Sequence, residues 1–192
     1  MRARRRERAR FAVWCYFFVV PHQVVIRHAA LEDIERAAVL GAEIVRLHHS
    51  VDSRRFFLPE NVEQGYAWWL RQEIARPEAV VMVAELQGDL VGYSYGSVED
   101  RDWSVLLDRH GVVHDVFVAE NARRQGVARA LVSAVIDKLE SMGAPLVVLS
   151  TMVQNESAQR LARSLGFRPT MLEFTRFHDS LEPGEGSVPQ RQ

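Results

Sequence analysis

The run at residues 123–128, Arg-Arg-Gln-Gly-Val-Ala, constrains the fold of this chain more than any other feature. An apolar stretch at residues 112–118 precedes it and predicts a strand. After it, apolar residues recur at every fourth position, which predicts an amphipathic helix. A helix that begins directly after a turn leaves its first backbone N–H groups open to an anion such as phosphate. Gly126 lets the backbone approach such a group closely, and Arg123 and Arg124 add positive charge.

The bulk composition indicates one globular domain and excludes several functional classes. A chain of 192 residues is long enough for one well-buried domain and short for two. A formal net charge of −1 gives no general attraction to nucleic acid or to an anionic membrane. Cys15 is the only cysteine, so neither an intramolecular disulfide nor a thiolate metal site forms. We expect a cytoplasmic protein without a metal, because the pair His48-His49 lacks a third ligand at a suitable spacing.

Residues 1–23 differ from the rest of the chain. Six arginines at residues 2–10 precede an apolar run at residues 11–20, which imitates a secretory signal. Pro21-His22-Gln23 follows, without a small-x-small cleavage site, so we favour an over-extended gene start or a poorly ordered arm. We therefore expect the folded domain at residues 24–178 and a disordered tail at residues 179–192, which is rich in proline and glycine.

Strands and helices are predicted to alternate in the order β-α-α-β-β-β-α-β-α-β. The expected strands are residues 24–27, 79–86, 90–98, 112–118, 146–151 and 167–177. The expected helices are residues 31–48, 62–75, 126–142 and 156–165. The all-apolar run at residues 146–151 is typical of a strand that is buried on both faces.

A second motif follows the first in the expected order. Asn155, Ala158 and Leu161 fit Asn-x-x-Ala-x-x-Leu, and Gly166-Phe167 follows them. With residues 123–128, which fit Arg/Gln-x-x-Gly-x-Gly/Ala, this pattern resembles the GCN5-related N-acetyltransferase (GNAT) superfamily. The resemblance covers about residues 24–177. It implies an α/β (α+β) fold: a mixed central sheet of about six to seven strands, flanked by about four helices, whose strands splay apart to form a cofactor cleft.

The resemblance also implies a site for acetyl-CoA as cosubstrate. Its pantetheine arm would pair with the main chain near Phe117 and Val118, and its pyrophosphate would lie on the signature loop. The implied loop residues are Arg123, Arg124, Gln125, Gly126, Val127 and Ala128. Asn155 would bind near the pantetheine or brace the splayed strands; simple N-capping of the next helix is an equally open interpretation.

His114 and Asp115, in the predicted strand that precedes the motif at residues 123–128, are candidates for catalysis. The run from His114 to Val118 resembles the Glu-Asp-x-x-Val run of polyamine-type acetyltransferases, with His114 at the position of a candidate general base. A histidine has a suitable pKa for this role, although a packed, hydrogen-bonded histidine is a competing interpretation. Strand alternation predicts that only one of His114 and Asp115 faces the cleft. We expect Asp115 to be structural or to orient the acceptor.

One position departs from the family pattern. Many members carry a tyrosine directly after the leucine of the second motif, where it is taken to protonate the departing thiolate; here that residue is Ala162. Acceptor binding would fall to the first two helices, their loop and the last strands. The side chains in question are His48, His49, Asp52, Phe56, Phe57, Trp68 and Trp69, with Trp103 elsewhere.

We therefore predict an acetyl-CoA-dependent N-acetyltransferase that acts on a primary amine of a small molecule by direct attack in a ternary complex. Two alternatives stay open. One is acetylation of a protein N-terminus or lysine. The other is an acyl-CoA-binding module with little turnover, which stays open because Ala162 replaces the tyrosine that is taken to protonate the thiolate. Apart from acetyl-CoA and the amine, we expect no nucleic-acid or membrane partner, and the resemblance is compatible with a homodimer.

Overall fold

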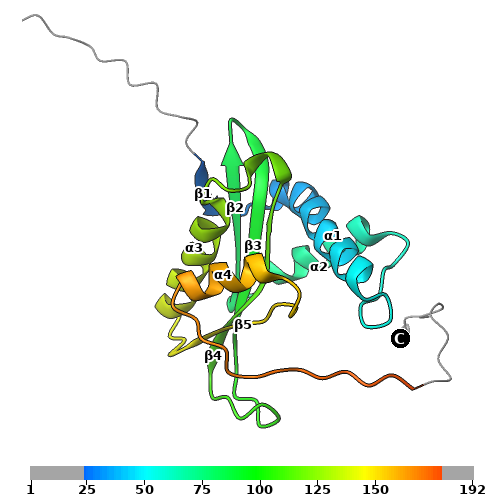
Figure 1. The fold of residues 1–192 in the computed structure, drawn as a ribbon. Helices are drawn as coiled ribbons and strands as arrows, with labels where there is room; N and C mark the ends of the chain where they lie inside the picture. Colours follow the sequence, from blue (N-terminus) through cyan, green and yellow to red (C-terminus); the bar gives the residue numbers. More distant parts are fainter. Residues whose placement is uncertain (1–23, 179–192) are drawn as a thin grey trace, which may run out of the picture.

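The computed structural model describes residues 24–178, so the expectations for residues 1–23 and 179–192 lie outside the described part. Five strands and four α-helices follow one another in this part of the chain (Figure 1). In chain order they are β1 (Val25–His28), α1 (Ile34–Val51), α2 (Val62–Glu73), β2 (Ala79–Leu86), β3 (Asp89–Glu99), β4 (His110–Val118), α3 (Val127–Ser141), β5 (Val147–Leu149) and α4 (Glu156–Ser164). Short 3-10 turns precede α1 (Leu31–Asp33) and α3 (Glu120–Ala122).

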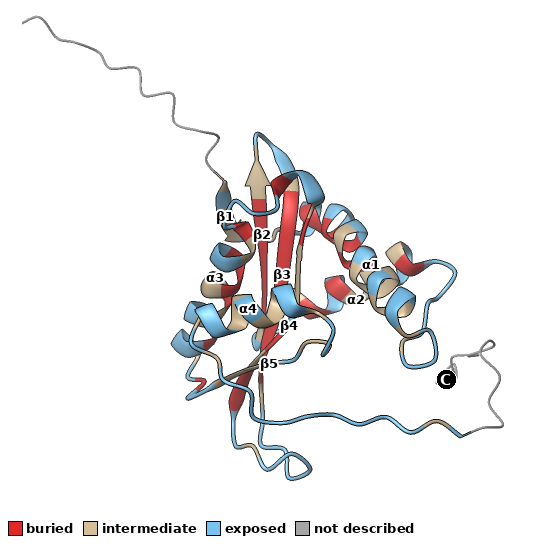
Figure 2. Cartoon of the chain, viewed as in Figure 1, coloured by how far each residue is buried: buried red, intermediate tan, exposed pale blue. Residues whose placement is uncertain are grey.

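The strands form one mixed sheet in the order β1-β2-β3-β4-β5. Neighbours are antiparallel except β4 and β5, which run parallel. Helices α1 and α2 cover one face of the sheet, and α3 and α4 lie on the other (Figure 1). The buried residues concentrate along β2, β3 and the inner face of α3, while α4 buries none (Figure 2). The α/β class and the order of elements as far as α4 agree with the sequence prediction.

Helix α3 lies unusually close to the sheet because three of the residues beneath it are glycines. A Cβ added at Gly92 or Gly111 would lie 3.1 Å from a side-chain atom of α3, on Leu131 or Leu139. At Gly96 it would lie 2.6 Å from Val135 Cγ1 and 2.8 Å from the carbonyl oxygen of Val112. The apolar stripe of α3 therefore packs directly against the backbone of β3 and β4.

We expect Gly96→Ala to lower the free energy of unfolding by about 1–3 kcal/mol, because the new methyl group would overlap with backbone that cannot move cheaply. The urea-unfolding midpoint measures the change. Gly65→Ala is the matched control: Gly65 is exposed in α2, and a Cβ there meets nothing within 4 Å. This control should gain about 0.5–1 kcal/mol from better helix propensity. Equal midpoints for wild type and Gly96→Ala would contradict the close packing.

The C-terminal part of the sheet differs from the prediction. The expected last strand at residues 167–177 does not form, so the described part has five strands instead of six to seven. The segment is extended but has no strand partner, and Met171, Leu172 and Phe174 remain largely exposed. Sequence alternation favours a strand, but a strand also needs a neighbour that supplies backbone partners.

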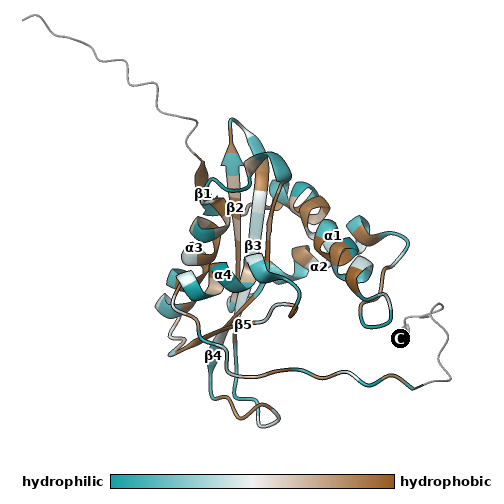
Figure 3. Ribbon diagram, viewed as in Figure 1, coloured by the Kyte–Doolittle hydropathy of each residue, from teal (hydrophilic) through white to brown (hydrophobic). Residues whose placement is uncertain are grey.

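Strand β5 is also shorter and less buried than predicted. It spans only Val147–Leu149 and its three residues are half-buried, instead of running over residues 146–151 with both faces covered. The reason is the neighbouring helix: α4 is mostly hydrophilic and carries no fully buried side chain, so it covers β5 incompletely (Figure 3). Among residues 24–178, no helix is long and apolar enough to cross a membrane.

Candidate active site

A cleft opens where β5 separates from β4. The two strands pair only from Gly111 with Val147 to Val113 with Leu149, so β4 has no strand neighbour on that edge from His114 onward. The cleft has a volume of about 310 Å³ and is walled by α1, the α1–α2 loop, β4, the end of β5 and α4. Its lining residues are Ile44, Val45, His48, Arg55, Phe56, Phe57, Val113, His114, Asp115, Val116, Leu149, Ser150, Thr151, Asn155, Ala158 and Leu161.

His114 and Asp115 both point to the face covered by α1 and α2, which corrects the prediction that only one of them would. A β-bulge causes the change: Tyr95 pairs with Asp115, but its neighbour Gly96 pairs with Val113, so His114 is the extra residue. The ring of His114 stacks on the ring of Tyr95, and Asp115 accepts a hydrogen bond from Tyr93 on the same face. The bulge thus places two chemically useful side chains side by side in the cleft.

Two phenols hold the carboxylate of Asp115. Tyr93 Oη donates to Asp115 Oδ2 (2.8 Å), Tyr66 Oη donates to the same oxygen, and the two phenol oxygens are 2.8 Å apart. Burial and the nearby carboxylate raise the pKa of both tyrosines, so both stay protonated donors. Asp115 makes no ion pair among the described residues. A negative charge without a basic partner therefore borders the cleft and suits a cationic amine.

Tyr66 and Tyr93 were missed by the sequence reasoning. Tyr66 lies in α2, where its ring fills the space beside Gly41: a Cβ at Gly41 would be 2.2 Å from the ring. Tyr93 lies in β3 and is fully buried. The sequence holds no local signal for their role, because the contacts of both tyrosines with Asp115 join distant segments and become visible only in the fold.

His114 is a partly buried, neutral base. Its ring lies 4.9 Å from that of Tyr95 at an interplanar angle of 21°, and its Nε2 is 2.8 Å from Ser97 Oγ. Burial lowers the pKa of His114 below its usual value, while Asp115, Glu99 and Glu73 raise it by smaller amounts. The imidazole is therefore uncharged at neutral pH and can accept a proton.

The start of α3 presents open backbone N–H groups, as predicted. Gly126 is the N-cap residue with φ +82°, a left-handed conformation, and no side chain caps the helix. Arg124 is also left-handed (φ +62°), and the side chain of Gln125 turns back to donate to the carbonyl of Asn121 (3.2 Å). The N–H groups of Val127 and Ala128 thus remain available to an anion. A Cβ at Gly126 would meet nothing within 4 Å, so the space in front of this turn is free of protein.

Arg123 lies against β4 rather than pointing outward with Arg124. Its Nε donates to the carbonyl oxygen of Val118 (2.9 Å), and its guanidinium carbon lies 5.5 Å from the centre of the Phe117 ring. The N–H of Ala119 donates to Val91 on β3, so the backbone groups of Val118 point to the opposite, open edge. Arg123 therefore braces the end of β4, and the Val118 N–H faces the edge that β5 leaves free.

Asn155 caps α4 and also borders the cleft. Its Oδ1 accepts hydrogen bonds from the N–H of Ala158 (3.0 Å) and from Ser157 Oγ (2.9 Å). The capping interpretation is therefore confirmed, while its contact with the cleft leaves the binding role open as well.

The residues expected at the acceptor site do not all lie at the cleft. Phe56 and Phe57 line the cleft; His48 packs edge-on against Phe56, and His49 Nδ1 lies 2.7 Å from the Phe56 carbonyl oxygen. Trp69 instead packs into the core against Tyr95, and Trp68 is exposed on α2. Asp52 caps the N–H groups that follow it in the α1–α2 loop.

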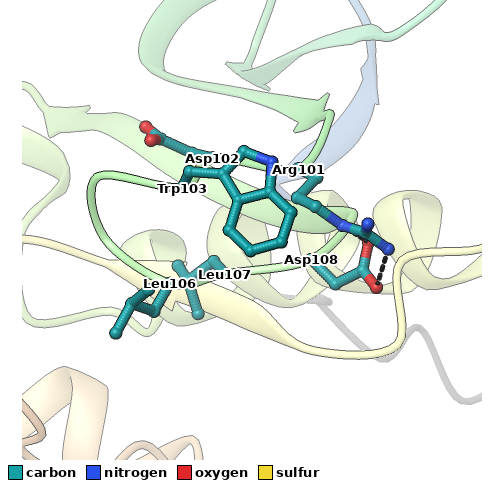
Figure 4. Close-up of a pocket in the computed structure, with 6 residues that line it drawn as sticks. All are labelled: Arg101, Asp102, Trp103, Leu106, Leu107 and Asp108. Atoms are coloured by element: carbon teal, nitrogen blue, oxygen red, sulfur yellow. Dashed lines mark hydrogen bonds and ion pairs between the residues drawn. The ribbon is translucent and has the colours of Figure 1, made fainter.

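Trp103 lies away from the cleft, at the tip of the loop between β3 and β4. There it borders a separate small hollow beside Leu106 and Leu107, next to the ion pair of Arg101 with Asp108 (Figure 4). The side of the cleft formed by α1 and its following loop therefore carries no tryptophan; its lining residues are Ile44, Val45, His48, Arg55, Phe56 and Phe57.

Arg55 is a further residue at the cleft that the sequence reasoning did not single out. Its guanidinium donates to Glu173 (2.7 and 3.1 Å), which places the extended segment at residues 167–178 beside the α1–α2 loop. Arg54 lies 4.3 Å from the centre of the Phe177 ring in the same region. Within residues 24–178, no group of three His, Cys, Asp or Glu side chains is placed to hold a metal ion.

Comparison with known proteins agrees with this geometry. The model of the Acetyltransferase (GNAT) family matches residues 41–167. The L-amino acid N-acyltransferase MnaT of Escherichia coli is 30% identical over 141 residues, which cover 72% of this chain and 73% of that protein. The N-alpha-acetyltransferase of Sulfurisphaera tokodaii is 28% identical over 151 residues, covering 74% and 79%.

A solved structure of an aminoglycoside N-acetyltransferase, AAC(6')-Iy in complex with CoA, shares the fold. Its TM-score is 0.67 at 18% sequence identity, and the match covers 84% of this chain and 99% of that one.

Proposed function

The chain belongs to the GNAT family of N-acetyltransferases, and from that premise we propose that it transfers an acetyl group from acetyl-CoA to a primary amine of a small molecule. The observation that carries the proposal is the cleft at the β4–β5 separation. It brings together a neutral histidine, a carboxylate without an ion-pair partner among the described residues, and the apolar side chains of α1 and its following loop. Its volume of about 310 Å³ lies in the range of small-molecule sites. The family uses acetyl-CoA, and its relatives include an L-amino acid N-acyltransferase and an aminoglycoside N-acetyltransferase.

The residues present suit acetyl-CoA at two places. The open N-terminus of α3 offers the N–H groups of Val127 and Ala128 to a pyrophosphate, with Arg124 exposed beside them. The free edge of β4 from His114 to Val118 offers main-chain groups to the amides of an extended pantetheine arm. Asn155 borders the same cleft from α4.

We assign the steps of the reaction as follows. Asp115 attracts the ammonium form of the acceptor, and His114 takes its proton, which leaves a neutral amine. The amine nitrogen then forms a bond to the thioester carbonyl carbon in a ternary complex, and the Val118 N–H stabilises the oxyanion. As the carbon–sulfur bond breaks, the nitrogen of the new amide gives up its second proton to solvent. The CoA thiolate leaves and takes a proton from solvent, and His114 returns its own proton to solvent. Cys15 lies outside the described residues and has no part in this assignment.

Acetylation of a protein N-terminus is the second candidate function. The similarity to an N-alpha-acetyltransferase favours it. The apolar side chains of Phe56 and Phe57 at the cleft favour the small molecule.

The release of free thiol from acetyl-CoA, measured across a panel of small amines, amino acids and N-terminal peptides, tests the proposal. We expect turnover with small amines or amino acids and little with peptides. The reverse preference would replace the first function by the second. Tight binding of acetyl-CoA with no thiol release on any acceptor would favour the acyl-CoA-binding module.

The absence of the family tyrosine can be tested by restoring it. Residue Ala162 is half-buried in α4 and directly follows Leu161, which lines the cleft. We expect Ala162→Tyr to raise kcat about tenfold over Ala162→Phe, less than general acids usually contribute, because a thiolate leaves with little help. The phenylalanine variant controls for the added ring. Equal kcat values in the two variants would show that protonation of the thiolate does not limit turnover.

A further inference from the structure

A chain of three side chains extends from the cleft to the surface along β3. His114 Nε2 lies 2.8 Å from Ser97 Oγ, Ser97 Oγ donates to Glu99 Oε1, and Glu99 Oε1 is 3.7 Å from His114 Nε2. Ser97 is fully buried, whereas the side chain of Glu99 is 40% exposed. The mechanism assigned above uses only His114, so the other two residues need a role of their own.

The chemistry of the three groups determines which ring nitrogen of His114 carries the proton. A carboxylate only accepts hydrogen bonds, so the single hydroxyl proton of Ser97 goes to Glu99. The oxygen of Ser97 must then accept, and the only group that can donate to it across the 2.8 Å contact is an Nε2–H. In neutral His114 the other nitrogen, Nδ1, is therefore the proton acceptor. Among the described residues, Nδ1 makes no hydrogen bond.

The same arrangement also fixes the plane of the ring. Tyr95 stacks on one side of the imidazole at 4.9 Å, and its own hydroxyl is held by Glu73 in α2. Ser97 and Tyr95 lie on one strand two residues apart, on the face that the bulge gives to His114. Tyr95 thus sets the orientation of the imidazole plane, and Ser97 sets the rotation of the ring within that plane.

We propose that Ser97 and Glu99 are positioning residues: they hold His114 in the Nε2–H tautomer, keep Nδ1 free as the proton acceptor, and stabilise the imidazolium once the proton has arrived. The catalytic part of this inference rests on the proposed function, in which His114 is the base. Its structural part, the tautomer, does not depend on any activity.

Several charged groups face His114, and they determine the expected pH dependence. Asp115 on β4, Glu99 on β3 and Glu73 on α2 all raise the pKa of His114, against the larger lowering by burial. Arg76, which follows α2, pairs with Glu73 (2.7 Å). Tyr95 donates its hydroxyl to Glu73 and stacks on the ring of His114. Glu99 raises the pKa of His114 and burial lowers it, so removing the charge of Glu99 should lower that pKa further.

The first experiment is NMR of the protein without substrates, using the ¹⁵N shifts of the histidine side chains, with His114→Gln to assign the signal. We expect the Nε2–H tautomer for His114 in the wild type and a mixture of tautomers in Ser97→Ala. A wild-type His114 in the Nδ1–H form would overturn the proposal, whatever the protein acetylates.

The second experiment is the pH profile of kcat/KM for acetyl transfer. In Glu99→Gln we expect the acidic limb to move down by about 0.5–1 pH unit, the effect of one charge at this distance in a watery environment. In Ser97→Ala we expect kcat to fall about tenfold or more with little change in KM, as when an orienting partner of a catalytic histidine is lost.

Asp100→Asn is the matched control. It removes the same charge one residue further along, at a side chain that is 96% exposed and paired with Arg109. Its pH profile should match that of the wild type. An unmoved limb in Glu99→Gln, or an equal shift in Asp100→Asn, would show that Glu99 has no specific role. If wild type shows the Nε2–H tautomer but no acetyl transfer, the structural part stands and the proposed function fails.

Discussion

Gly126→Glu is expected to weaken the binding of acetyl-CoA about 100-fold or more, while the protein stays folded. The new carboxylate would lie at the open N-terminus of α3, where it would occupy the N–H groups proposed for the pyrophosphate and repel its charge. Loss of one or two charge-assisted hydrogen bonds accounts for this magnitude. Isothermal titration calorimetry with acetyl-CoA measures the effect directly and needs no knowledge of the acceptor.

The opposite end of the same helix supplies the control. Gly143 lies one residue beyond the C-cap of α3 with φ +91°, and a Cβ there also meets nothing within 4 Å. Gly143→Glu therefore carries the same backbone strain, about 1–2 kcal/mol for a residue with a Cβ in the left-handed region, and the same added charge. Its affinity for acetyl-CoA should equal that of the wild type. A similar loss in both variants would attribute the effect to destabilisation, and normal binding in Gly126→Glu would contradict the proposed phosphate site.

His114→Ala is expected to lower kcat by about 10²–10⁴-fold, the usual contribution of a general base, and to remove the acidic limb of the pH profile. Burial lowers the pKa of His114 below about 6.5, so the base-competent neutral form grows as pH rises through that lowered pKa. Wild-type kcat/KM should therefore rise with pH on the acid side, with the midpoint of the rise below about 6.5. Steady-state thiol release between pH 5 and 8 checks this, with thermal unfolding as a test of integrity.

His114→Glu distinguishes a base from a packing role. The resembling family run has glutamate at this position, so a carboxylate should restore part of the activity and move the acidic limb toward a lower pH, because its ordinary pKa is about 4.3. His28→Ala, a substitution on the distant edge strand β1, should leave kcat unchanged. If His114→Ala kept full activity, His114 would be a packed histidine and the amine would lose its proton to solvent.

The sequence contained enough to predict the strand–helix order and the open start of α3. Both depend on local signals: period-four apolar residues, and a glycine that adopts φ +82° at the helix N-cap. The family motifs then indicated that the cleft lies where β4 and β5 separate. The N-cap role of Asn155 was anticipated because its position before α4 is a local property as well.

What the sequence could not predict depends on pairing between distant segments. The bulge that brings His114 and Asp115 to one face arises because β4 has one residue more than β3 needs at that point, which is a property of two strands together. The absence of the last strand is similar, since residues 167–177 alternate well enough but find no partner. The hydroxyl groups of Tyr66 and Tyr93 meet Asp115 only after α2 has packed on β3.

The two sides of the cleft differ in how firmly they are built. The side formed by α1 and β4 belongs to the main cores, whereas the opposite side consists of a three-residue strand and a helix with no buried residue. Local opening costs free energy in proportion to the apolar contacts that are lost, so α4 can lift away from the sheet at a small fraction of the cost of global unfolding. The side of the cleft that carries His114 is thus the more firmly packed of the two.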